Sequence, residues 1–187
     1  DVAGVLVRAN LKSSIESELK NTTSTILNMV RTSASVSIKN YLRGVADKNK
    51  DLAEHFYQMY RQGNISEKQA KNRVKNIFLT QSIGKTGYLY CINSQGIIKV
   101  HPKEKLLGND LSSYSFIQKQ KKRKKGYLEY EWKNPGEDKA RPKALYMTYF
   151  APWDWIISAS TYRNEFSQLI NIQDFRESVL SVKFGET

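Results

Sequence analysis

The chain has 187 residues, 40% of them apolar, so it can bury a core and is expected to form one domain with an appendage. It carries 30 Lys and Arg against 18 Asp and Glu, a net charge of +12. This composition excludes a disordered chain. No apolar run approaches the roughly 18–20 residues of a spanning helix, so no membrane span is expected within the sequence.

The first 60 residues have a helical pattern without proline, with apolar side chains mostly three, four or seven apart. One helix of this length would extend roughly 90 Å, which a compact domain does not cover. We therefore expect residues 36–60 to pack on the domain, and the earlier part to form a stalk or pair with a second copy. The small residues at 32–37 leave open a break into two helices, and two ordinary core helices remain the alternative.

A second helix is predicted from Glu67 to about Thr80. Ser66 is its expected N-cap, and Gln69 stands at the capping-box position. The Gly-x-x-Gly at residues 84–87 then leads into a strand. A phosphate-binding loop leads into a helix and ends in Gly-Lys-Ser/Thr, so we do not interpret this turn as one.

Residues 88–92 and 97–100 are rich in β-formers and flank the turn at residues 93–96, which predicts a β-hairpin. The hairpin delivers His101 to a strand end, where ligand contacts are often found, although an ordinary loop histidine is the alternative. Cys91, within the first strand, is expected to be a buried core thiol.

Residues 119–125 contain six basic side chains out of seven, which is half of the net charge. Such a run can contact phosphates or acidic lipid head groups. A nucleic-acid-binding domain that uses this run is therefore the alternative function. We favour a short helix with a solvated polar face that ends before Gly126.

Three further strands are predicted at residues 127–132, 144–150 and 155–160, separated by turns at residues 134–142 and around Asp154. Together with the hairpin they make five antiparallel strands. The predicted fold class is α+β, with the long helix on one face of the sheet and loops plus the short helix on the other.

No catalytic or metal-binding pattern is found in the sequence, so we predict neither an enzyme nor a cofactor. Polar aromatics and cations instead gather on the predicted strands, as in a small-molecule pocket that suits a carboxylate. These candidates are His101, Tyr130, Trp132, Lys143 and Tyr146, although any one aromatic could equally belong to the core.

The segments GKTGYLYCINSQGIIKVHPKEKLLGNDL, GYLEYEWKNPG and RPKALYMTYFAPWDWIISASTY, in this order after a long helix, resemble a single-type Cache domain. The resemblance covers about residues 36–163. It implies a PAS-like extracytoplasmic sensor with a C-terminal helix that binds a small organic acid, part of a membrane-anchored chemoreceptor, histidine kinase or diguanylate cyclase. The residues that match the family's pocket motifs are His101, Tyr130, Trp132, Lys143 and Tyr146. Arg43 is a second candidate anion partner.

The long helical pattern and an internal echo predict an organisation for the rest of the chain. Residues 1–35 would be a stalk that follows a transmembrane helix and supports a homodimer. Residues 164–187 would connect to a second module, because residues 177–187 echo residues 76–86, just before the hairpin. A sequence without an initiator Met is expected to be a piece of a longer protein.

Overall fold

The computed structural model describes residues 1–134 and 136–169. The chain divides into two units, Asp1–Ser37 and the residues from Ile38 onward. Helix α1 is assigned over Val2–Arg61 and includes the small residues at 32–37, where a break had remained open. The predicted echo at residues 177–187 lies outside the described residues.

In the first unit, α1 leaves its apolar side chains in water. Leu11 is 60% exposed and Leu19 is 62% exposed, and most other large apolar side chains up to Val36 are also exposed, although Ile26 is half-buried. This part of α1 therefore buries little apolar surface within the chain.

In the second unit, α1 continues with buried side chains at Ile38, Leu42, Ala46 and Ala53, spaced three to four or seven apart as one face of a helix requires. Helix α2, Glu67–Leu79, follows. The predicted capping box is confirmed, because Gln69 N donates to Ser66 Oγ while Gln69 Oε1 accepts from Ser66 N.

The five predicted strands are confirmed and form one antiparallel sheet in the order β2-β1-β5-β4-β3. They are β1 Tyr88–Ile92, β2 Ile98–Val100, β3 Gly126–Trp132, β4 Arg141–Phe150 and β5 Trp155–Tyr162. Short helices complete the domain: η1 Glu104–Leu106, α3 Ser115–Arg123, η2 Ala151–Trp153 and α4 Arg163–Leu169. Strand β4 begins three residues earlier than expected, because residues 141–143 pair with β3.

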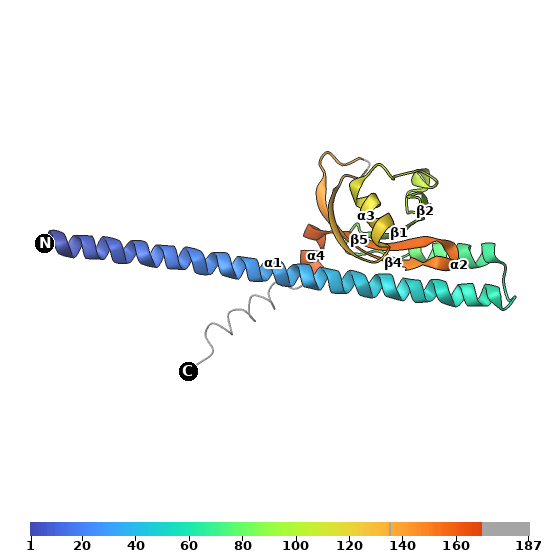
Figure 1. Ribbon diagram of the computed structural model, residues 1–187, viewed down its shortest axis with the longest axis horizontal. Coiled ribbons are helices and arrows are strands. Elements are labelled where there is room, and N and C mark those ends of the chain that lie inside the picture. The colour runs from blue at the N-terminus through green and yellow to red at the C-terminus, as the bar shows by residue number, and fades with distance from the viewer. Residues whose placement is uncertain (135, 170–187) are drawn as a thin grey trace, which may run out of the picture. The chain divides into compact units, whose positions relative to one another are not determined.

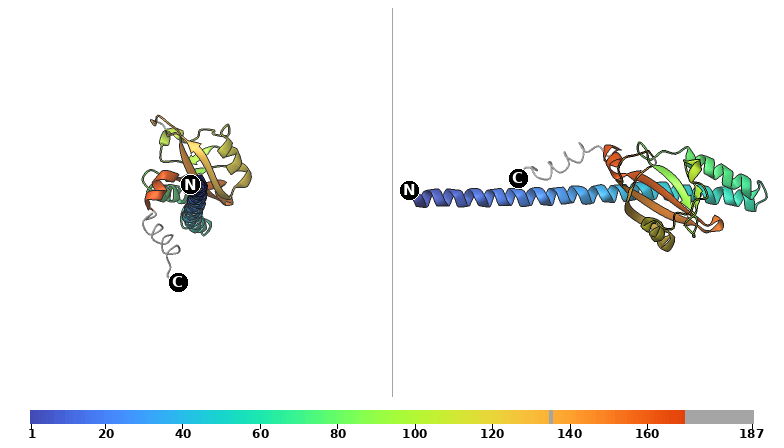
Figure 2. Two further views of the ribbon diagram at one scale, coloured as in Figure 1. Left: turned by 90° about the vertical axis from the view of Figure 1, so that its left-hand side faces the viewer. Right: turned by 90° about the horizontal axis from the view of Figure 1, so that it is seen from above.

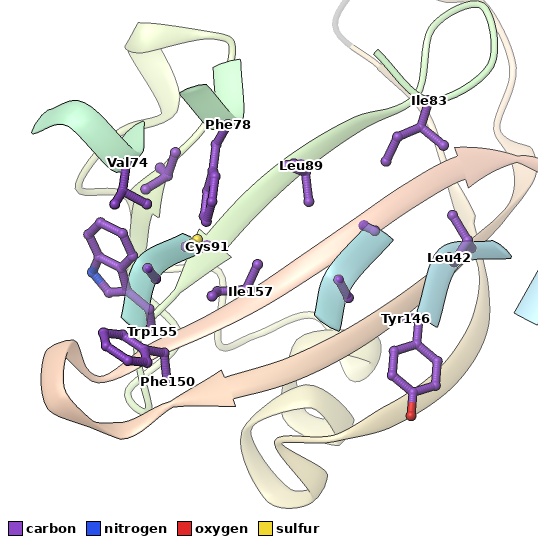
Figure 3. Close-up of a cluster of buried hydrophobic side chains, with 14 of the residues drawn as sticks. Leu42, Val74, Phe78, Ile83, Leu89, Cys91, Tyr146, Phe150, Trp155 and Ile157 are labelled. Atoms are coloured by element: carbon purple, nitrogen blue, oxygen red, sulfur yellow. The ribbon is translucent and has the colours of Figure 1, made fainter. Parts of the chain in front are cut away.

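One side of the sheet, which we call the helix face, is covered by α1 and α2 (Figures 1 and 2). Phe78 and Val74 of α2 pack there against Leu89, Cys91 and Ile157 of the sheet, as Figure 3 shows. The prediction that Cys91 is a buried core thiol is confirmed, and its burial raises the pKa of the thiol.

The other side, which we call the loop face, is covered by α3 and the segment between β2 and α3 (Figure 1). Ile117 of α3 packs there with Tyr90, Ile98 and Met147. Strand β5 is buried along its whole length, as expected for a central strand that is covered on both faces. The predicted arrangement of long helix on one face and short helix on the other is confirmed.

The turn into β1 depends on Gly87. A Cβ on this residue would lie 2.2 Å from the carbonyl oxygen of Ile83 and 2.4 Å from that of Ser160. No side chain fits so close to two backbone oxygens, so glycine is required for the turn to reach β5.

Candidate functional site

A small cavity lies on the loop face, at the end of the sheet where β2 stops. Its lining comes from β1, β2, β3, α3 and the segment between β2 and α3: Tyr88, Tyr90, Ile98, His101, Leu106, Leu111, Phe116, Ile117, Tyr130 and Trp132. The enclosed volume is about 20 Å³, enough for about one water molecule.

Strand alternation and α3 together build the aromatic wall of this cavity. Tyr88 and Tyr90 are two apart on β1, and Tyr130 and Trp132 are two apart on β3, so each pair shares a face. Phe116 of α3 stacks on Tyr130, with ring centroids 4.2 Å apart, and lies edge-on to Trp132 at 5.5 Å. Helix α3 therefore closes the cavity with an aromatic side chain.

Behind the wall, a buried hydrogen-bond chain fixes the hydroxyl of Tyr90. Tyr90 Oη donates to Gln120 Oε1 at 2.9 Å, and Gln120 Nε2 donates to Ser158 Oγ at 2.7 Å. Burial raises the pKa of both Tyr90 and Tyr130 well above 10, so both phenols stay neutral. Neutral phenols can donate hydrogen bonds to an anion.

His101 follows β2 directly and is only 6% exposed. Its Nδ1 accepts from the backbone N–H of Lys103 at 2.9 Å, so the neutral ring carries its proton on Nε2. Burial, followed by the charges of Lys143 and Lys103, lowers the pKa of His101 to about 4. The ring is therefore a neutral donor at physiological pH.

Lys143 on β4 is 1% exposed, and its Nζ lies 4.0 Å from the ring centroid of Tyr88 and 5.2 Å from that of Tyr162. The ammonium group makes no hydrogen bond or ion pair with any residue that the structure describes. Burial lowers the pKa of Lys143 to about 7, although the negative charges of Glu137 and Glu165 act in the opposite direction. An anion would supply the partner that this group lacks.

The two nearby carboxylates already have partners. Glu137 Oε1 lies 2.6 Å from Arg141 Nη2, and Glu137 Oε2 accepts from the hydroxyl of Tyr162 at 3.1 Å. Glu165 on α4 accepts from Thr86 N at 2.7 Å and from Thr86 Oγ1 at 2.5 Å. Neither carboxylate is left to pair closely with the ammonium of Lys143.

An open cleft of about 560 Å³ adjoins the cavity, and Tyr88 and His101 line both. Lys85, Thr86 and Lys103 lie on its wall, together with Glu137. The site therefore consists of a closed aromatic part and an open charged part.

Comparison with known proteins gives the family. A family model described as the Cache domain, dCache_2, matches residues 7–187, nearly the whole chain. The chain belongs to the Cache domain family. The PAS-like α+β fold implied by the sequence resemblance is thereby confirmed.

Solved structures of Cache domains share this fold. One, titled "Periplasmic sensor domain of chemotaxis protein", matches with a TM-score of 0.61 and 22% identity, over 68% of this chain and 96% of that one. Another, titled "Structural basis for carboxylic acid recognition by a Cache chemosensory domain", matches with a TM-score of 0.59 and 19% identity, over 66% of this chain and 91% of that one. At such identities the likeness shows the fold alone.

The structure of this Cache domain brings four of the six predicted site residues together. His101, Tyr130 and Trp132 line the cavity, and Lys143 lies against its Tyr88 wall. Tyr146 lies in the helix-face cluster and Arg43 is exposed on α1, so neither lines the cavity. The alternation of β4 gives the reason for Tyr146, since residues 143 and 146 are an odd number apart and face opposite sides.

Sequence reasoning missed Tyr88, Tyr90 and Phe116. The first two were predicted to lie on a strand, and their spacing of two residues was a usable signal for a shared face. Phe116 gave no such signal, because its stacking on Tyr130 depends on where α3 docks.

Most of the basic run lies on the exposed side of α3, which ends at Arg123. Gln120 is completely buried, whereas Lys119, Lys122 and Arg123 are exposed. The run thus belongs to an ordinary amphipathic helix, and the comparisons give no support to the nucleic-acid alternative.

The described part of this Cache domain contains neither a candidate membrane span nor a candidate metal site. No helix there is long and apolar enough to cross a membrane. No group of three or more His, Cys, Asp or Glu side chains in residues 1–134 and 136–169 could hold a metal ion.

Proposed function

We propose that this Cache domain is the extracytoplasmic sensor of a transmembrane signalling receptor, a chemoreceptor, histidine kinase or diguanylate cyclase, and that it binds a small organic acid. It acts by binding rather than by catalysis. The observation that carries the proposal is the buried ammonium group of Lys143, which has no hydrogen-bond or ion-pair partner among the described residues and lies against a cavity wall. A buried charge of this kind is stabilised by an anion.

The neighbouring groups suit a carboxylate. Lys143 supplies the charge, His101 supplies an Nε2–H donor, and the phenol of Tyr88 supplies a further donor. The aromatic rings around them lower the local dielectric, which strengthens each of these contacts. The similar solved structure whose title names carboxylic acid recognition supports this ligand class.

Binding requires the cover of the cavity to move, because a volume of about 20 Å³ is smaller than even a short acid. The cover consists of Leu106, Leu111 and Phe116, all of which are only partly buried. A ligand that favours the arrangement in which this cover is displaced would increase its population.

The proposed route of transmission runs through the terminal helices. Glu165 in the first turn of α4 binds Thr86 and lies 3.6 Å from Arg141, next to the site. Phe166 of α4 contacts Tyr41 of α1, with ring centroids 5.4 Å apart. A ligand that changes the field around Lys143 therefore acts on a contact that holds α4.

Calorimetry and thermal-shift measurements with acetate, propionate, butyrate and succinate test the proposal. At least one acid should stabilise the wild type, and Lys143→Met should lose this effect while keeping most of the side-chain volume. Lys99→Met, an exposed site on β2, is the matched control and should bind like the wild type. Equal stabilisation of wild type and Lys143→Met would remove Lys143 from the site, and no response to any acid would reject the ligand class.

We further propose that residues 1–35 form a stalk that follows a membrane anchor and pairs with a second copy. Ile15, Leu19, Ile26 and Met29 recur at steps of four, seven and three, as in the seam of a coiled coil. Sedimentation equilibrium should show a dimer that Leu19→Lys converts to monomer. A wild type that remains monomeric at high micromolar concentration would contradict the pairing.

A further inference from the structure

The open cleft next to His101 carries an excess of positive charge. We infer that this cleft is the outer half of the ligand site and selects acids with a second anionic group, which Lys103 and Lys85 contact. The inference rests on the proposed function, because it assigns the first carboxylate to Lys143.

The cleft is lined by two lysines and one glutamate, and they differ in whether other side chains already bind them. Its cations are Lys85, which is exposed, and Lys103, which is half-buried. Within the described part of the chain, neither forms an ion pair or a side-chain hydrogen bond. Their ammonium groups are therefore available to a ligand.

Glu137 is the carboxylate on the same wall, and it is not available to these lysines. Its two oxygens are engaged by Arg141 Nη2 at 2.6 Å, by the hydroxyl of Tyr162 at 3.1 Å and by the backbone N–H of Asn134 at 3.1 Å. The guanidinium of Arg141 also stacks on the Tyr162 ring at 3.6 Å. Because Arg141 balances the charge of Glu137, the remaining charge of the cleft is positive.

The inner and outer parts of the site adjoin each other at two shared side chains. Tyr88 and His101 line both the closed cavity and the open cleft, and Lys143 Nζ lies over the Tyr88 ring at 4.0 Å. The backbone of Lys103 is held to the His101 ring by a hydrogen bond of 2.9 Å. A short acid lying along Tyr88 and His101 would therefore extend from Lys143 toward Lys103.

The titration of His101 supports a shared positive potential. After burial, the charges of Lys143 and Lys103 are the largest causes that lower the pKa of this ring. Both lysines therefore act on the histidine at the junction of the two parts. Such a potential favours a dianion over a monoanion of the same length.

A matched pair of four-carbon acids tests the inference by calorimetry on the complete chain. Succinate and butyrate differ mainly in the second carboxylate. We expect succinate to bind the wild type about tenfold more tightly than butyrate. The contact with half-buried Lys103 should contribute about fivefold, and the contact with exposed Lys85 about twofold. Lys103→Met should remove about fivefold of succinate affinity and leave butyrate within about twofold.

Lys105→Met is the control, because Lys105 is exposed two residues further along and does not line the cleft. It should change neither affinity. Equal binding of the two acids by the wild type would overturn the inference, and so would an equal loss of both in Lys103→Met. Butyrate binding without a preference for succinate would leave the proposed function standing, whereas no binding of either acid to the wild type would reject both.

Discussion

The helix face and the loop face of the sheet are both largely shielded from water, but by different kinds of side chain. On the helix face, α1 and α2 contribute Leu42, Ala46, Val74 and Phe78, which are all completely buried. On the loop face α3 contributes the completely buried Ile117, whereas Leu106, Leu111 and Phe116 are only partly buried. The first face is closed by two helices and the second by loops and one short helix.

The polar groups of the two faces differ as well. On the helix face the buried amide of Asn49 is paired in both directions with Gln81, at 2.9 and 2.7 Å. The loop-face site contains a buried ammonium, Lys143, without a partner of this kind among the described residues. The helix face also has one unpaired group, because Trp153 Nε1 makes no hydrogen bond with any described residue, but that indole is neutral. The loop face differs in that its unpartnered group, Lys143, can carry a charge for which an anion would be a partner.

The largest difference is expected for a pair of phenylalanines, one on each face. Phe78→Ala should lower the free energy of unfolding by about 3–5 kcal/mol, because it leaves a cavity in a closed core. Phe116→Ala should cost only about 1–2 kcal/mol, because its ring is partly exposed and its neighbours can adjust.

Urea denaturation of the two variants measures both values. Phe150→Leu, a smaller change within the same helix-face core, should cost less than Phe78→Ala and serves as a control for general sensitivity. Equal losses for Phe78→Ala and Phe116→Ala would mean that the loop face is as tightly packed as the helix face.

Replacement of Lys143, the unpartnered cation, should raise the free energy of unfolding rather than lower it. Below pH 7, Lys143→Met should raise the free energy of unfolding by about 1–4 kcal/mol, because a buried charge is replaced by an apolar side chain of similar volume. The pKa of Lys143 is about 7 in the folded chain and near 10.5 in the unfolded one. The unfolded chain therefore binds more protons between these values, so wild-type stability should rise with pH across this window.

Denaturation of wild type and Lys143→Met at pH 6, 8 and 9.5 isolates this effect, since other titrating groups cancel in the difference. The advantage of the variant should shrink steadily toward pH 9.5. A difference that does not change with pH would show that Lys143 keeps an ordinary pKa in the folded chain.

The sequence predicts features that depend on local patterns, and it does not predict features that depend on how separate elements pack. Local sequence patterns are enough to predict the strands, the capping box at Ser66 and Gln69, and the burial of Cys91. Tyr130 and Lys143 lie close together because β3 pairs with β4, and His101 lies near them because it follows the end of β2. Tyr146 shares β4 with Lys143 but, by strand parity, faces the other side of the sheet. The positions of Phe116 and Glu165 depend on where separate helices dock, which local patterns do not determine.

The smallest effect concerns the contact between the site and α4. Thr86 lines the open cleft, and its hydroxyl and backbone N–H both donate to Glu165, which is only 7% exposed. A double-mutant cycle with Thr86→Ala and Glu165→Gln should give a coupling energy of about 1 kcal/mol in urea denaturation, since a hydroxyl–carboxylate bond is lost.

The exposed pair Glu67 and Lys71 on α2, whose charged atoms are 3.0 Å apart, provides the comparison cycle. Its coupling should be about 0.3–0.5 kcal/mol, because water screens an exposed helix pair. If the Thr86 and Glu165 cycle gives no more than this, the contact cannot resist displacement of α4, and a ligand in the cleft would need another route to the C-terminal helix. A clearly larger coupling would mean that any ligand that moves Thr86 also moves the start of α4.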